Sequence, residues 1–192
     1  SRIFCDVERF SNDVEEVMAQ YGMGALYEST DAGEPMRIVP GALRSEILEN
    51  YYWKHHNQLS QAVDEQLDKF GKALIIDCHS YSDIPFQRDL NQDRSRPDFC
   101  IGTDGHHTPD ELIQTSIQFF NDKGYSLGIN NPYSGSIVPL EYYQKDSRVE
   151  SIMLEINRKL YLENGTNVKS SNYGEIKELV TEFLETMRKS PC

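Results

Sequence analysis

The residues best suited to chemistry stand at the end of a predicted buried strand, Ala73 to Ser80. Apolar residues are followed at once by Asp77, Cys78 and His79, the pattern of a strand whose last side chains reach solvent or a ligand. In open α/β sheets, ligands bind just outside the carboxyl ends of strands. A neutral imidazole at such a point is a good zinc ligand, and a nearby carboxylate can orient it. The alternative is a core histidine that is hydrogen-bonded to a neighbour.

A second group of charged residues lies at the start of the chain, where residues 2–7 are predicted to form a strand. Arg2, Asp6 and Arg9 combine two guanidinium groups with a carboxylate. Arginine presents a planar fork that can hold a substrate carboxylate through two parallel hydrogen bonds. The alternative is that Arg9 and Asp6 form only a structural ion pair. A strand at the first residues also leads us to expect that the chain begins inside a domain.

A single carboxylate, Glu155, interrupts the apolar run from Val149 to Ile156. Burying an unpaired charge is costly, so this side chain needs either a partner or a task in a site. Arg158, three positions later, could neutralise it. Strands of one sheet would bring His79, Glu155 and the arginines within reach of one another, although the sequence alone does not show that they converge.

The elements that must position these residues alternate between strands and helices, as hydrophobic periodicity and Pro/Gly punctuation indicate. The predicted helices span residues 43–70, 108–124 and from about 171 onward, and the further predicted strands span residues 73–80, 98–102, 125–129 and 149–156. We therefore predict an α/β fold with a mixed, mostly parallel central sheet flanked by helices. No repeat or linker divides the chain, so we expect a single domain over residues 1–192.

Composition narrows the classes of partner. A net charge of −12 argues against nucleic acid or an anionic membrane as a partner, and no apolar run approaches a membrane span. The first residues lack the zones of a signal peptide, and the four cysteines show no metal-ligand spacing. We expect a reduced, cytoplasmic protein with a small acidic substrate, whereas the oligomeric state is left open.

Several sequence blocks resemble, in order, the signatures of the N-formylglutamate amidohydrolase family, and together they cover essentially the whole chain. These blocks are Ser1-Arg-Ile-Phe-Cys-Asp-Val-Glu-Arg-Phe10, Leu74-Ile-Ile-Asp-Cys-His-Ser80, Arg96-Pro-Asp-Phe-Cys-Ile-Gly-Thr-Asp104, Gly124-Tyr-Ser, Asn131-Pro-Tyr-Ser-Gly135 and Glu155-Ile-Asn-Arg-Lys-Leu-Tyr161. The resemblance implies a zinc-dependent hydrolase of zinc-carboxypeptidase-like (phosphorylase/hydrolase-like) architecture. Such enzymes cut an amide between a small acyl group and the nitrogen of an acidic amino acid.

The resemblance also assigns roles to residues. It implies that His79 is a metal ligand and that Glu155 activates water. Arg2, Asp6 and Arg9 look like the substrate clamp of the relatives, although Glu8 stands where those relatives often have Asn. Asn130 and Tyr133 are expected to line the pocket.

The metal site implied by the resemblance is incomplete in this sequence. Catalytic zinc normally has three protein ligands, and related enzymes take a histidine and a carboxylate from a segment before Arg2. No His-x-x-Glu occurs in the chain, and helix capping explains the nearest substitute, His107-Thr-Pro-Asp110. We therefore expect the other zinc ligands upstream of residue 1, and hydrolysis of N-formyl-L-glutamate or a similar N-acyl amino acid. The alternative is a non-catalytic relative that binds an acidic amino-acid-like ligand without metal.

Overall fold

The structure is a computed structural model that describes residues 1–189. The chain divides into two compact units, one made of Ser1–Glu65 with Phe86–Leu90, and the other of Gln66–Pro85 with the chain from Asn91 onward. The prediction that they belong to one amidohydrolase domain stays a prediction. Over the described residues, no helix has the length and apolar character needed to cross a membrane.

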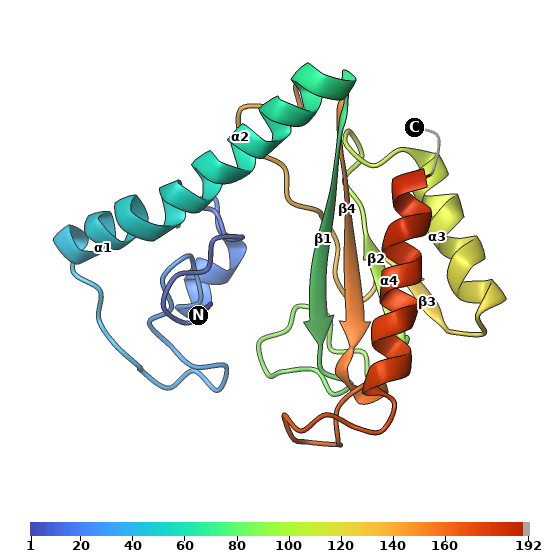
Figure 1. Cartoon of the computed structure of the whole chain (residues 1–192). Coiled ribbons are helices and arrows are strands. Elements are labelled where there is room, and N and C mark those ends of the chain that lie inside the picture. The colour runs from blue at the N-terminus through green and yellow to red at the C-terminus, as the bar shows by residue number, and fades with distance from the viewer. Residues whose placement is uncertain (190–192) are drawn as a thin grey trace. The chain divides into compact units, whose positions relative to one another are not determined.

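The second unit contains a mixed sheet of four strands in the order β1-β4-β2-β3 (Figure 1). The strands are β1 (Ala73–Tyr81), β2 (Phe99–Gly102), β3 (Leu127–Ile129) and β4 (Val149–Asn157). β1 pairs with β4 and β2 with β3 in parallel, whereas β2 and β4 are antiparallel. The predicted mixed, mostly parallel sheet flanked by helices is therefore confirmed, with each strand close to its predicted position.

Two helices cover one face of this sheet: α3 (Asp110–Asp122) and α4 (Tyr173–Lys189) lie on the same side of it in Figure 1. Alternate residues of the strands point to this face and form an apolar core with both helices. Its centre is aromatic: the Phe99 and Phe120 rings stack with centroids 4.3 Å apart, and Phe183 lies 5.0 Å from Phe120. Burial of this face fixes which strand residues remain on the other face.

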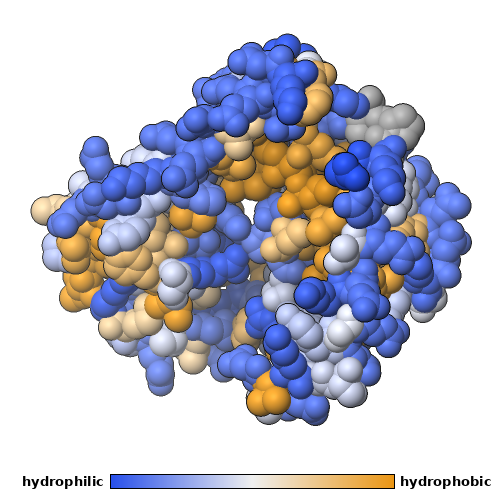
Figure 2. Space-filling view, in the orientation of Figure 1, coloured by the Kyte–Doolittle hydropathy of each residue, from blue (hydrophilic) through white to orange (hydrophobic). Residues whose placement is uncertain are grey.

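Helical structure runs without interruption from residue 41 to residue 70, close to the predicted helix over residues 43–70. It consists of α1 (Gly41–Ile47), a π-helical turn (Leu48–Tyr52) and α2 (Trp53–Phe70). The helix ends where predicted, at Gly71, whose φ of +75° is an ordinary conformation for glycine. Figure 2 shows mainly hydrophilic side chains along the visible side of α2.

Apart from α1, the π-helical turn and the part of α2 up to Glu65, the first unit has little regular structure besides a 3₁₀ helix (Val17–Tyr21), as expected for residues 11–42. Its small core gathers buried side chains from well-separated segments: Cys5, Ala25, Leu26, Ile47 and Tyr52. The thiols of Cys5, Cys78 and Cys100 are free, and Cys192 lies outside the described residues.

The prediction of a strand over residues 2–7 is wrong. These residues form turns, in which the amides of Phe4 and Cys5 both donate to the carbonyl of Ser1. The physical reason is the carboxylate of Asp6, which forms ion pairs with Arg2 and Arg9 at 3.2 and 3.5 Å. Residues three and four apart in an extended strand are separated by roughly 10–13 Å, so the chain has to turn to make both contacts.

Replacing Phe120 by Ala tests the aromatic core. Phe120 is fully buried between Phe99 and Phe183, so Phe120→Ala should lower the free energy of unfolding by about 3–5 kcal/mol, measured by urea denaturation. Phe70→Ala is the matched control because the Phe70 side chain is 60% exposed, and it should cost less than about 1 kcal/mol. Equal losses for the two variants would contradict this description of the core.

Candidate active site

The strand register places His79 directly opposite Glu155 in the parallel pairing of β1 with β4. Residues directly opposite each other in paired strands project from the same face of a sheet, and Leu154 and Ile156 on either side of Glu155 point into the apolar core. On the other side of β4, Cys100 is the register partner of Glu155. We call the sheet face that carries Asp77, His79, Tyr81, Cys100 and Glu155 the polar face.

An aspartate and a histidine from the same strand meet on the polar face. Asp77 and His79 are two positions apart in β1, so their side chains project to the same side, and His79 Nε2 lies 2.8 Å from Asp77 Oδ1. Both side chains are largely buried, with 13% of His79 and 14% of Asp77 exposed. The two groups therefore face each other in a largely buried environment, and the orientation of the imidazole by Asp77 stays a prediction.

Glu155 is buried, with 7% of its surface exposed, although it is a carboxylate. Arg158, the neutralising partner that the sequence suggested, has its guanidinium engaged by Ser80. Arg158 donates from Nε to the hydroxyl of Ser80 at 3.1 Å and from Nη2 to the carbonyl of Ser80 at 2.9 Å. A buried carboxylate beside an imidazole and a thiol is a group suited to receiving and returning a proton.

A loop after β3 carries the two residues expected to line the pocket. Asn130 has a φ of +54°, and its side chain is engaged by Thr103: it accepts from the Thr103 amide at 2.9 Å and donates to the Thr103 hydroxyl at 2.7 Å. Its amide therefore holds the loop to the end of β2. The Tyr133 hydroxyl accepts a hydrogen bond from Arg96 Nη1 at 3.2 Å. A substrate contact by either residue stays a prediction.

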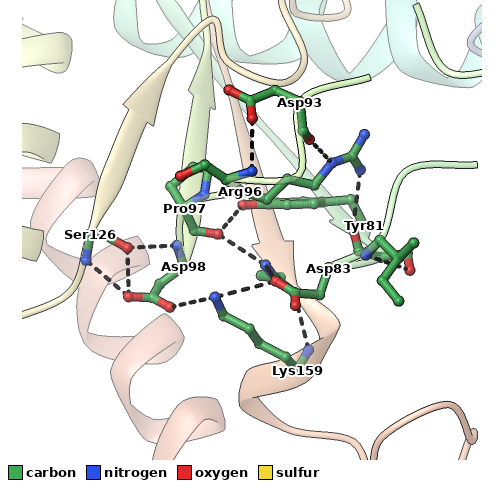
Figure 3. Close-up of polar contacts among 12 residues, drawn as sticks. Tyr81, Asp83, Asp93, Arg96, Pro97, Asp98, Ser126 and Lys159 are labelled. Atoms are coloured by element: carbon green, nitrogen blue, oxygen red, sulfur yellow. Dashed lines mark hydrogen bonds and ion pairs between the residues drawn. The ribbon is translucent and has the colours of Figure 1, made fainter. Parts of the chain in front are cut away.

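Polar contacts beyond the carboxyl end of β1 fix the chain that leads into β2 (Figure 3). The hydroxyl of Tyr81 donates to the carbonyl of Pro97 at 2.6 Å, and burial raises the pKa of this phenol, with further contributions from Cys100 and Glu155. Lys159 lies 3.3 Å from Asp83 and 3.4 Å from Asp98.

Asp98 also accepts hydrogen bonds from the amide and the hydroxyl of Ser126, at 3.0 and 2.7 Å. Burial opposes ionisation of this carboxyl, but the Ser126 hydrogen bonds and the Lys159 ammonium outweigh it, so the pKa of Asp98 is lowered. The charged form of Asp98 therefore ties the start of β2 to the chain just before β3.

The predicted clamp residues lie together in the first unit. Asp6 is 3% exposed, pairs with Arg2 and Arg9, and accepts a hydrogen bond from the Tyr27 hydroxyl at 3.1 Å. Burial, and after it the Asp6 carboxylate, raises the pKa of the Tyr27 phenol. Arg9 also pairs with Glu16 at 3.4 Å. The ion pair that the sequence suggested is thus present, and binding of a substrate carboxylate by these arginines stays a prediction.

His107 has a structural environment. It is fully buried, its Nδ1 lies 2.7 Å from the Val149 carbonyl, and its Nε2 accepts from the Gln144 amide at 2.8 Å. The structural interpretation of this histidine is confirmed, but its explanation by helix capping is wrong. The Thr108 hydroxyl donates to the Ser151 carbonyl at 2.6 Å, and the N-cap residue of α3 is Pro109, which makes no side-chain capping hydrogen bond.

Comparison with known proteins identifies the family. The sequence profile of the N-formylglutamate amidohydrolase family matches residues 1–162. This chain belongs to that family. An N-formylglutamate deformylase of Pseudomonas putida is 27% identical over 170 residues, which cover 85% of this chain and 62% of that protein. The chain thus spans about 62% of the length of this curated relative.

Two solved structures share the fold of this family member. The crystal structure of N-formylglutamate amidohydrolase from Ralstonia eutropha JMP134 matches with a TM-score of 0.83 and 22% identity, over 98% of this chain and 73% of that chain. A gene product of Agrobacterium tumefaciens matches with a TM-score of 0.65 and 15% identity, over 99% of this chain and 66% of that chain. Both similarities concern the fold.

The residues of the polar face fit the donor chemistry of a zinc ion in part. An imidazole nitrogen and a carboxylate oxygen are both good zinc ligands, and those of His79 and Asp77 face each other. A catalytic zinc normally has three protein ligands, so this pair supplies two of the usual set. That the remaining ligands come from upstream of residue 1 stays a prediction.

Sequence reasoning assigned no role to Arg96, the arginine that contacts Tyr133. Arg96 is 6% exposed and donates hydrogen bonds from within a loop. The available signal was an arginine just before the strand at residues 98–102, within one of the blocks that resemble the family. A charged residue so close to a buried strand needs partners, but those partners could not be named from the sequence.

Asp98 provides a test by pH. Its pKa is lower in the folded protein than the ordinary value of about 3.9, so its contribution to stability is complete above that pH and is lost as the pH falls through the folded value. Asp98→Asn should therefore weaken the fall in the urea midpoint between about pH 6 and about pH 3. The exposed Asp122, changed to Asn, is the control. If the urea midpoint falls with pH to the same extent in both variants and in the unaltered protein, this assignment is contradicted.

Proposed function

We propose that this family member hydrolyses the amide bond of N-formyl-L-glutamate or a similar N-acyl amino acid, releasing formate and the free amino acid. Membership of the family supports the reaction class. The observation that carries the proposal is the register of β1 and β4, which sets His79 beside Glu155 on the polar face. Arg2 or Arg9 is proposed to bind the substrate's carboxylate, since a guanidinium matches that group bidentately.

In the proposed reaction, Glu155 acts as general base and then as general acid. It accepts a proton from the attacking water as the bond between oxygen and the formyl carbon forms, and it returns this proton to the amine nitrogen as the carbon–nitrogen bond breaks. The carboxylate of Asp77 and the imidazole of His79 face each other in the same part of the polar face. A zinc ion held by His79 and Asp77 would polarise the formyl carbonyl and lower the pKa of water to about 7.

A binding protein without catalysis is the second candidate, because a family member could keep the arginines and lose the metal. The two candidates differ in a simple assay. The purified protein should release formate from N-formyl-L-glutamate, and a chelator should stop the release until zinc is restored. Release that a chelator does not affect would remove zinc from the proposal, and binding of N-formyl-L-glutamate without any release would favour the binding protein.

Glu155→Gln should lower kcat at least about a hundredfold, since a positioned general base contributes at least that much, while bound zinc and KM change little. Steady-state kinetics and metal analysis of the same preparation measure these quantities. Glu150→Gln is the matched control, because Glu150 lies on the same strand but its register partner Leu74 packs against the apolar core. Unchanged turnover in Glu155→Gln would remove Glu155 from its proposed role.

A further inference from the structure

The loop at residues 130–135 folds back over the polar face of the sheet. The Cys100 thiol donates to the Tyr133 carbonyl at 3.3 Å. Two glycines permit the close approach, because a Cβ at Gly128 would collide with the carbonyl oxygen of Asn131, and one at Gly102 with that of Gly135. The strand register places both glycines on the same side as Cys100 and Glu155. Tyr133 is therefore held next to the strand position that neighbours Glu155.

A buried arginine fixes the side chain of Tyr133. Arg96 Nη1 donates to the Tyr133 hydroxyl at 3.2 Å, and its guanidinium carbon lies 5.6 Å from the centroid of the same ring. The guanidinium is also 5.9 Å from the centroid of Tyr81, whose ring meets that of Tyr133 edge to face at 5.7 Å. Arg96 thus contacts Tyr133 through both its hydroxyl and its ring.

The guanidinium of Arg96 is itself held in place by the backbone. It donates to three carbonyl groups at 3.0 to 3.3 Å, those of Ser82, Asn91 and Asp93. The contact with Asp93 is visible in Figure 3. Such a set of contacts uses the planar, many-donor fork of arginine, which the single ammonium of lysine cannot reproduce.

We infer that Arg96 is a positioning residue of the proposed amidohydrolase, which holds Tyr133 and its loop against the polar face beside Glu155. The inference rests on the proposed function and on the prediction from the sequence that Tyr133 lines the substrate pocket. In this role Arg96 acts through Tyr133. Loss of the Arg96–Tyr133 hydrogen bond should therefore impair catalysis in the same way whichever partner is changed.

A double-mutant cycle tests this coupling. Arg96→Lys keeps the charge but not the fork, and Tyr133→Phe removes only the oxygen that accepts the hydrogen bond. Each change should lower kcat/KM for N-formyl-L-glutamate about tenfold or more, which is the effect of losing one hydrogen bond to a charged group. The kcat/KM of the double variant should lie within about threefold of that of the less active single variant. If the fold-losses in kcat/KM of the two single variants multiply in the double variant, the inference is overturned. Arg94→Lys, at an exposed arginine of the same loop, is the control and should leave kcat/KM unchanged.

A measurement that needs no activity separates this inference from the proposed function. In protein labelled with ¹³C-tyrosine, the Tyr133 signal is identified by its absence from Tyr133→Phe. This signal should shift in Arg96→Lys and stay in place in Arg94→Lys; an unmoved signal in Arg96→Lys overturns the inference even if the protein releases formate. If the signal shifts in Arg96→Lys but the unaltered protein releases no formate, the proposed function is defeated, whereas the contact by which Arg96 positions Tyr133 is supported. If Arg96→Lys does not fold, Tyr133→Phe decides alone, because unchanged kcat/KM there overturns the inference.

Discussion

The parallel register between β1 and β4 is the constraint on which the site depends. Alternate residues of both strands pack against α3 and α4, and this burial leaves His79 and Glu155 opposite each other on the polar face. A slip of one residue in either strand would move its polar side chains into an apolar core, where an unpaired carboxylate is too costly to persist. The hydrophobic core therefore determines the register of β1 and β4, and this register places His79 opposite Glu155.

Carboxylates that are fully or partly buried organise segments without regular secondary structure in both units. Asp98 holds the start of β2 to Ser126 through hydrogen bonds that stabilise its charged form. Asp6 contacts two arginines and a tyrosine in the part of the first unit before α1, where little regular secondary structure is present. In each case one carboxylate accepts hydrogen bonds or ion pairs from several donors. These side-chain contacts fix the conformation of a segment that has no backbone hydrogen-bond ladder.

Most of the regular structure could be predicted from the sequence, because the sheet and its helices follow local periodicity. The strand at residues 73–80 and the helix over residues 43–70 are close to their observed bounds. The prediction for residues 2–7 failed because it gave more weight to their apolar residues than to the ion pairs of Asp6 with Arg2 and Arg9, which turn the chain. The role of Arg96 was missed for a related reason: its partners range from Ser82 to Tyr133, and no local pattern connects positions so far apart in the sequence.

The position of a bound substrate tests the central claim most directly. A crystal structure of the Glu155→Gln variant soaked with N-formyl-L-glutamate would trap the substrate before cleavage. We expect the formyl group on the polar face of the sheet, in contact with the side chain at position 155 and next to His79. A formyl group bound away from both positions would contradict the account, even if the protein were shown to release formate.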